Sequence, residues 1–277
     1  MAPVTWKKRL VGIWSWKRPL YSLAFIYFTL ALVAWLLADH FIFQPPGTPY
    51  PDDRNGFSQL GEGEEAIAIF HLPAIPNMPT LLWSHGNAQN LTSLQPALEY
   101  FHALGFGVIS YDYPGYGESA GSPDEEGCYR AIEATYQHLT GPLDVPPSDL
   151  VLVGQSVGTG PACWLAARHD HAALVLISPF MSAFRSITRI PLLPGDRFPN
   201  HQHLTQVTSP LLVIHGEEDE VIPCSQGQSL FDLSPSPEKF FLPVSEAGHN
   251  DLFLSNAFHL PSLILDLVAR SHPGDSR

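Results

Sequence analysis

The chain has 277 residues, 45% of them hydrophobic, which is enough for one large α/β domain with a substantial core. The only charged residues before Asp39 are basic: Lys7, Lys8, Arg9, Lys17 and Arg18. The remainder holds 9 basic and 27 acidic residues, a formal charge of −18, which argues against binding to nucleic acid or to anionic head groups.

The first predicted element is an apolar helix over residues 19–38, a stretch of 20 residues without a charge. About 20 such residues are needed to cross the hydrocarbon core of a bilayer. Basic residues precede this stretch and none follows before Arg54. The positive-inside rule therefore predicts a single-pass anchor with a cytoplasmic N-terminus and an extracytoplasmic domain, either periplasmic or lumenal.

Two other interpretations of residues 19–38 remain open. A cleaved signal peptide would have a shorter apolar core, and Leu36 fits badly in the small-residue cleavage site that would precede Ala38. A buried helix of a soluble protein would show a polar face, which this stretch lacks. With an uncleaved anchor, the chain divides into a cytoplasmic basic segment (1–18), a transmembrane helix (19–38), a proline-rich linker (39–56) and a catalytic domain (57–272).

Short apolar runs alternate with helical segments after the linker. Strands are predicted at 65–72, 80–84, 108–111, 150–153, 173–177, 211–214 and 239–243. Helices are predicted at 92–104, 124–139, 159–168 and 260–270. This alternation predicts a mostly parallel sheet with helices on both faces, in which functional residues lie at the carboxyl ends of strands.

The sequence Gly-Gln-Ser-Val-Gly at residues 154–158 joins the strand at 150–153 to the following helix. It matches the G-x-S-x-G nucleophile elbow, whose tight turn lifts a serine hydroxyl out of the sheet. The two glycines allow strand and helix to pass closely around a strained serine backbone. Ser156 is therefore the predicted nucleophile.

The loop after the strand at 80–84 reads His-Gly-Asn-Ala, from His85 to Ala88. In this architecture that loop supplies one N–H of the oxyanion hole, and the residue after the serine supplies the other. The amides of Asn87 (or its neighbour Ala88) and Val157 are the predicted donors. His85 is expected to shape the loop, since it follows the wrong strand for a catalytic base.

Two later loops supply candidates for the catalytic base and the acid that orients it. Four carboxylates follow the strand at 211–214, and we select Asp219 because Gly216 makes a tight turn three residues before it. His249 follows the last strand and Gly248. The order Ser156, Asp219, His249 is that of α/β-hydrolases and differs from the orders in chymotrypsin-like and subtilisin-like proteases.

Other polar residues give no comparable signal. The His-x-His pairs at 169–171 and 201–203 have no cluster of cysteines or carboxylates beside them, so no metal is expected. No organic cofactor is required by a serine hydrolase. The three cysteines, Cys128, Cys163 and Cys224, are too few for a disulfide framework and are expected to be small buried hydrophobic residues.

About 33 residues, 178–210, lie where relatives of this architecture insert a lid, which predicts a small and fairly open site. The apolar side chains of this segment either line an acyl pocket or pack on the domain: Phe180, Met181, Phe184, Ile187, Ile190, Leu192 and Leu193. Its three arginines either bind a substrate phosphate or carboxylate or form a solvated face: Arg185, Arg189 and Arg197.

These motifs resemble the α/β-hydrolase domain 17/13 type over about residues 60–255. The resemblance rests on residues 85–88, 111–119, 154–158 and 198–200, on His215-Gly216 with Asp219, and on residues 248–251. That group contains membrane-associated serine hydrolases, including protein depalmitoylases. The resemblance implies an α/β-hydrolase fold with a Ser-His-Asp triad, but the depalmitoylases have a cysteine-rich N-terminus, and here no cysteine precedes Cys128.

The sequence as a whole predicts a membrane-anchored serine hydrolase that cleaves carboxylic esters or thioesters of small-molecule or lipid-like acyl substrates. The alternative is a serine peptidase or aminopeptidase on the same fold. A non-catalytic binding protein is the weakest hypothesis because Ser156, Asp219 and His249 are all present.

Overall fold

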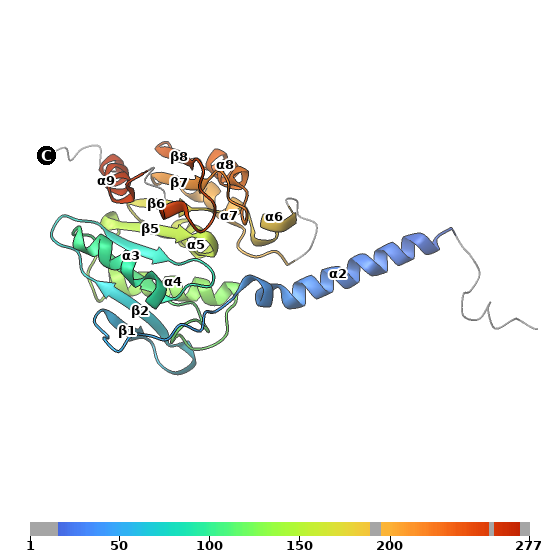
Figure 1. Cartoon of the computed structure of the whole chain (residues 1–277), viewed down its shortest axis with the longest axis horizontal. Coiled ribbons are helices and arrows are strands. Elements are labelled where there is room, and N and C mark those ends of the chain that lie inside the picture. Colours follow the sequence, from blue (N-terminus) through green and yellow to red (C-terminus); the bar gives the residue numbers. More distant parts are fainter. Residues whose placement is uncertain (1–15, 189–194, 255–257, 272–277) are drawn as a thin grey trace, which may run out of the picture.

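A computed structural model of the chain describes residues 16–188, 195–254 and 258–271. Its centre is an eight-stranded sheet in the order β1-β2-β4-β3-β5-β6-β7-β8 (Figure 1). The strands are β1 (Phe57–Leu60), β2 (Ile67–Leu72), β3 (Thr80–Ser84), β4 (Gly107–Tyr111), β5 (Leu150–Gln155), β6 (Ala173–Ile177), β7 (Leu211–Gly216) and β8 (Lys239–Val244). β1 and β2 run antiparallel to their neighbours, and every pairing from β4 to β8 is parallel.

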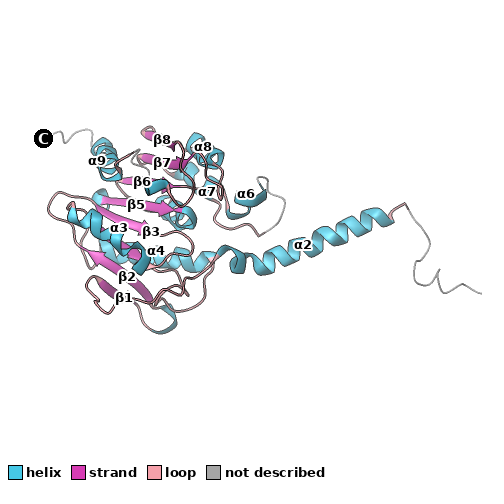
Figure 2. Cartoon of the chain, viewed as in Figure 1, coloured by secondary structure: helices cyan, strands magenta, loops and turns pink. Residues whose placement is uncertain are grey.

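Helices cover both faces of the sheet (Figure 2). They are α3 (Leu91–Ala103), α4 (Glu125–Thr140), α5 (Thr159–Ala166), α6 (Ala183–Thr188), α7 (Asn200–His203), α8 (Cys224–Leu233) and α9 (Leu260–Ser271). Successive residues of β5 point to opposite faces. Leu152 joins a core cluster with α4, α5 and α8, whereas Val151 and Val153 join a second cluster with α3 and α9.

The predicted α/β-hydrolase fold is confirmed, and each of the seven predicted strands is found. The strand β1 and the helices α6, α7 and α8 were not predicted. β1 has only four residues and none is buried, so no period-2 pattern marks it. The helix α8 contains Gly227, which leaves room for the ring of His215. This contact exists only in the folded chain, so the sequence alone offers no reason for a glycine inside a helix.

The apolar helix α2 (Arg18–Ile42) meets the domain at its C-terminal end, and its N-terminal part extends away from the domain (Figure 1). It is four residues longer at its C-terminal end than the predicted span. Its most apolar 18-residue window has a mean hydropathy of 2.1, and among the described residues it is the one helix long and apolar enough to cross a membrane.

The segment after α2 is tied to the domain along most of its length. Phe43 is buried, and its ring meets those of Tyr116 and Phe198 edge to face. Further along, the carbonyl of Thr48 accepts a hydrogen bond from the Asn90 side chain, at 2.9 Å. The predicted linker is therefore a strap on the domain surface rather than a free spacer.

The turn between β5 and α5 is crowded on both sides. A Cβ on Gly154 would lie 2.7 Å from the Gly158 carbonyl oxygen, and a Cβ on Gly158 would overlap the Ser84 carbonyl. Ser156 between them has φ +52°, in the left-handed region that L-residues rarely adopt. The predicted nucleophile elbow is therefore present as a strained turn.

Replacing Gly158 by alanine should disrupt this turn, since the added methyl would meet main-chain atoms of β3 that cannot move independently. We expect Gly158→Ala to lower the free energy of unfolding by about 1–3 kcal/mol or more, the usual cost of overpacking. Urea unfolding of the full chain in detergent measures it. The control is Gly47→Ala, because a Cβ at Gly47 would meet nothing within 4 Å; equal stability of the two variants would contradict the account.

Candidate active site

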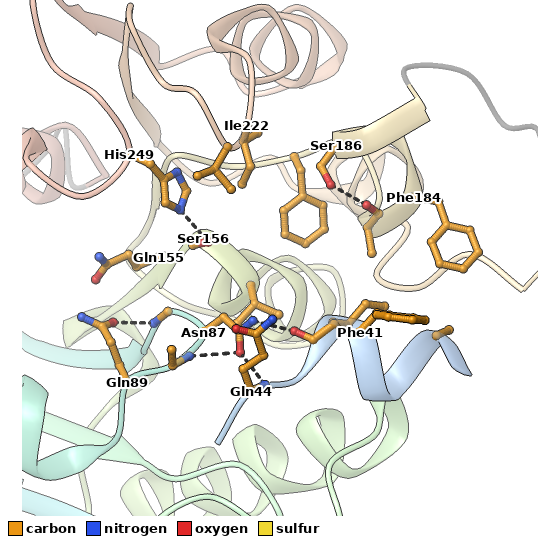
Figure 3. A pocket seen from close by; sticks show the side chains of 18 of the residues that line it. Phe41, Gln44, Asn87, Gln89, Gln155, Ser156, Phe184, Ser186, Ile222 and His249 are labelled. Atoms are coloured by element: carbon orange, nitrogen blue, oxygen red, sulfur yellow. Dashed lines mark hydrogen bonds between the residues drawn. The ribbon is translucent and has the colours of Figure 1, made fainter. Parts of the chain in front are cut away.

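The side chains of Ser156, His249 and Asp219 form one hydrogen-bonded line across the carboxyl ends of β5, β8 and β7. His249 Nε2 lies 3.0 Å from Ser156 Oγ, and His249 Nδ1 lies 2.7 Å from Asp219 Oδ2 (Figure 3 shows the first pair). Parallel strands end at a common edge, which brings together residues 93 positions apart in the chain. The spacing is that required for a nucleophile, a base and an orienting acid.

Asp219 is distinguished from the three competing carboxylates by burial. Its side chain is fully buried, whereas Glu217, Glu218 and Glu220 are exposed. Asp219 Oδ1 accepts hydrogen bonds from the amides of Val221 (3.0 Å) and Ile222 (2.7 Å), so Oδ2 is left facing the imidazole.

A second histidine, His215, also contacts the Asp219 carboxylate. The buried His215 places Nε2 3.4 Å from Asp219 Oδ2 and 2.8 Å from the Ile222 carbonyl oxygen. Burial raises the pKa of Asp219, but the hydrogen bonds from His215, His249 and the Ile222 amide outweigh burial and hold this pKa well below its ordinary value. Asp219 is therefore charged at neutral pH. The His215-Gly216 pair was noted in the sequence, but no role for the His215 ring was predicted.

The predicted oxyanion loop is held by the side chain of Asn87. Its Oδ1 accepts from the Gln44 amide (2.9 Å), the Tyr116 hydroxyl (2.7 Å) and the Ala88 amide (3.0 Å), and its Nδ2 donates to the Ile42 carbonyl (2.6 Å). Because the Ala88 amide is used within the loop, Asn87 is the better candidate of the two for the oxyanion donor. Sequence reasoning gave the Asn87 side chain no role, and Gln44 and Tyr116 were missed, since only the folded chain brings them to this loop.

His85 lies under the loop, fully buried against the ring of Tyr113 at 4.2 Å between centroids. Its Nδ1 is 2.9 Å from the Gly86 carbonyl oxygen and its Nε2 is 3.2 Å from Asp112 Oδ1. The buried Asp112 also accepts hydrogen bonds from the Leu91 amide and the Tyr50 hydroxyl. This network fixes the start of α3 and the strap, which is the loop-shaping role expected of His85.

An apolar pocket of about 780 Å³ opens beside Ser156 and His249 (Figure 3). Its domain side includes Phe180, Ala183, Phe184 and Ile222, and its other side is formed by α2. Of the predicted acyl-pocket side chains, Phe180 and Phe184 line this space, whereas Met181 packs on the core. The side chain of Ile187 and all of Ile190, Leu192 and Leu193 lie outside the described parts of the chain.

The arginines of this segment do not face the pocket where they are described. Arg197 pairs with Asp39 at the end of α2, at 2.9 Å, and its side chain is only 17% exposed, so it does not belong to a solvated face. Arg185 lies beside α8, where the Gln226 side chain donates to its carbonyl at 2.8 Å. Arg189 lies outside the described residues.

His169, His171 and the three cysteines are packed against or bonded to other parts of the protein. His169 contacts Glu133 at 2.8 Å, and His171 contacts Ser209 Oγ at 2.6 Å. Within residues 16–188, 195–254 and 258–271, no three histidine, cysteine, aspartate or glutamate side chains are grouped as metal ligands. Cys128 and Cys163 are buried, and Cys224 is half-buried.

The depressed pKa of Asp219 predicts a pH dependence of stability. Its pKa is lower in the folded chain than in the unfolded chain (about 4), so the unfolded state binds more protons and stability falls as the pH falls through this range. The difference in free energy of unfolding between wild type and Asp219→Asn should therefore be largest near pH 7 and shrink below about pH 4. Urea titrations at several pH values measure it, with the exposed Asp232→Asn as control; a difference independent of pH would contradict the assignment.

Comparison with protein-family models and with curated proteins identifies relatives of this chain. Residues 79–194 match the family model described as alpha/beta hydrolase fold. The chain is 42% identical over 205 residues to human alpha/beta hydrolase domain-containing protein 17C, covering 72% of this chain and 61% of that protein. It is 41% identical over 205 residues to alpha/beta hydrolase domain-containing protein aho-3 of Caenorhabditis elegans, covering 69% and 59%.

The chain thus spans about 60% of the length of these curated relatives. Among solved structures, an esterase from Pyrococcus furiosus superposes with a TM-score of 0.66 at 14% identity, covering 82% of this chain and 98% of the esterase, which is a likeness of fold alone. On the sequence matches and the fold together, the chain belongs to the α/β hydrolases and is of the α/β hydrolase domain-containing protein 17 type.

Proposed function

We propose that this chain is a membrane-anchored serine hydrolase that cleaves carboxylic ester or thioester bonds of lipid-like or acylated substrates. The observation that carries the proposal is the line from Ser156 Oγ through His249 to the buried Asp219, at 3.0 and 2.7 Å, at the edge of an apolar pocket. A pocket lined by phenylalanine, alanine and isoleucine side chains suits an acyl chain.

The first half of the reaction forms an acyl-enzyme. Ser156 Oγ attacks the carbonyl carbon of the substrate as its proton passes to His249 Nε2, and Asp219 stabilises the resulting imidazolium. The amides of Asn87 and Val157 bind the negative charge that develops on the carbonyl oxygen. The bond to the alcohol or thiol leaving group then breaks, and the leaving group takes the proton from His249.

The second half releases the acid. A water molecule attacks the acyl carbon and gives its proton to His249, the bond to Ser156 Oγ breaks, and the serine oxygen recovers the proton. The chain's own residues carry every proton in this cycle. The negative charge of Asp219, kept by its low pKa, matches the role of pairing with the transient imidazolium.

The peptidase alternative is less well supported by the pocket. An aminopeptidase must bind the α-ammonium group of its substrate, and a carboxylate is the usual partner for that charge. The described residues that line the pocket include no aspartate or glutamate. Asp219 and Glu220 are hydrogen-bonded to His249 instead.

We also propose that α2 is an uncleaved anchor that places the domain outside the cytoplasm. Its length, its apolar composition and the basic residues that precede Arg18 support this orientation. The strap and the Arg197–Asp39 pair would then hold the site close to the membrane surface.

A fluorophosphonate probe tests the nucleophile. Wild-type protein should be labelled covalently, and Ser156→Ala should lose essentially all labelling because, in the described part of the chain, Ser156 carries the hydroxyl that is hydrogen-bonded to His249 Nε2. The control is Ser148→Ala, an exposed serine just before the start of β5 and so at the opposite end of that strand from Ser156, which should label as wild type does. Labelling retained in Ser156→Ala would refute the proposal, and faster turnover of aminoacyl-arylamides than of p-nitrophenyl esters would favour the peptidase.

Protease protection tests the orientation. In intact spheroplasts or sealed vesicles of known sidedness, protease added on the extracytoplasmic side should degrade the domain, because only the basic N-terminal segment is expected to be cytoplasmic. A domain that is protected until the membrane is permeabilised would overturn the orientation. Full-length protein recovered in the soluble fraction without detergent would overturn the anchor itself.

A further inference from the structure

The pocket beside Ser156 is shared between the domain and the anchor helix. Six residues of α2 line it: Leu30, Val33, Ala34, Ala38, Phe41 and Ile42. Spacings of three and four residues place them mainly along one stripe of the helix. Leu30, Val33 and Phe41 are 57%, 46% and 67% exposed, so this wall is open rather than packed.

The domain fixes the position of this helical wall. Asp39 accepts two hydrogen bonds from the Arg197 guanidinium, at 2.9 and 3.3 Å, and the side chain of Trp35 occupies the space above Gly195. The Ile42 carbonyl is bound by the Asn87 side chain. The C-terminal half of α2 is therefore held beside the pocket by contacts on several sides, including one from the predicted oxyanion loop.

The same stripe leads away from Ser156 and into the predicted membrane span. At about 1.5 Å per residue, Leu30 lies about 18 Å along the helix axis from Ile42. If the span ends at Ala38, Leu30 lies about 12 Å inside the apolar layer. At the other end of the stripe, the Ile42 carbonyl accepts a hydrogen bond from the Asn87 side chain at 2.6 Å.

We propose that α2 is one wall of the acyl-binding site as well as an anchor, and that the enzyme takes long-chain acyl substrates from the bilayer along this stripe. The inference rests on the proposed function. The acyl chain lies between α2 and the Phe180–Phe184 side of the pocket, with its carbonyl carbon at Ser156 Oγ. The distal end of the chain stays in the apolar layer, so the substrate need not leave the membrane entirely before it reacts.

Tryptophan substitutions on α2 test this geometry. Ala34→Trp fills the pocket, and Leu36→Trp places the same side chain on the opposite side of the helix, two residues along. A second matched pair is Val33→Trp, which lines the pocket, and Leu32→Trp, which is 54% exposed and does not. Full-length proteins are reconstituted in phosphatidylcholine vesicles, and kcat/KM is measured for p-nitrophenyl myristate and p-nitrophenyl butyrate.

The ratio of the two kcat/KM values is the readout, since it does not depend on the fraction of protein that folds. Wild type should favour the myristate. Ala34→Trp and Val33→Trp should lower the ratio by about tenfold or more, the effect of losing the burial of about two methylene groups. Leu36→Trp and Leu32→Trp should leave it within about twofold of wild type.

Other results overturn the inference in distinguishable ways. If the ratio of kcat/KM values is unchanged in Ala34→Trp and Val33→Trp, or falls equally in their controls, then α2 does not contact the acyl chain of the substrate. A wild-type enzyme that hydrolyses only the butyrate leaves the proposed function standing and removes the long-chain substrate. If neither ester is hydrolysed and fluorophosphonate does not label Ser156, the proposed function fails, and this inference fails with it.

Discussion

The left-handed backbone of Ser156 is the constraint on which the rest of the site depends. It exists because β5, the turn and α5 approach β3 so closely that Gly154 and Gly158 have no room for a side chain. The turn raises the serine oxygen above the sheet edge, where it meets His249 from a loop more than ninety residues later. The packing of β5 against β3 therefore sets the position of the hydroxyl. The other loops of the site are arranged around that point.

Two separate hydrogen-bond networks hold those loops. On one side, the buried Asp219 is fixed by two backbone amides and backed by His215, so its free oxygen faces the imidazole. On the other side, the Asn87 side chain binds its own loop, the last residue of α2 and Gln44. The first network serves the proposed proton transfer. The second joins α2 to the proposed oxyanion loop, so α2 and the site are mechanically connected.

The strands could be predicted because each is a short run of apolar residues bounded by turn residues, and β3 and β6 were predicted to the residue. The strand β1 escaped prediction because an exposed edge strand carries no burial pattern. For the site, Ser156 followed from a local motif, and Asp219 and His249 followed from their places after strands. Their catalytic roles stay predictions, although the distances are those such roles require.

The sequence by itself determined the sheet, the elbow, the order of the three site residues and the apolar helix, because each of these depends on local patterns or on chain order. Only the tertiary structure decided that Asp219 is buried against His249 while its three carboxylate neighbours are exposed, that Arg197 pairs with Asp39, and that α2 forms a wall of the pocket. These are contacts between residues 30 to 158 positions apart. No local pattern encodes such contacts, since they arise when separate elements pack on a common sheet and its loops meet at one edge.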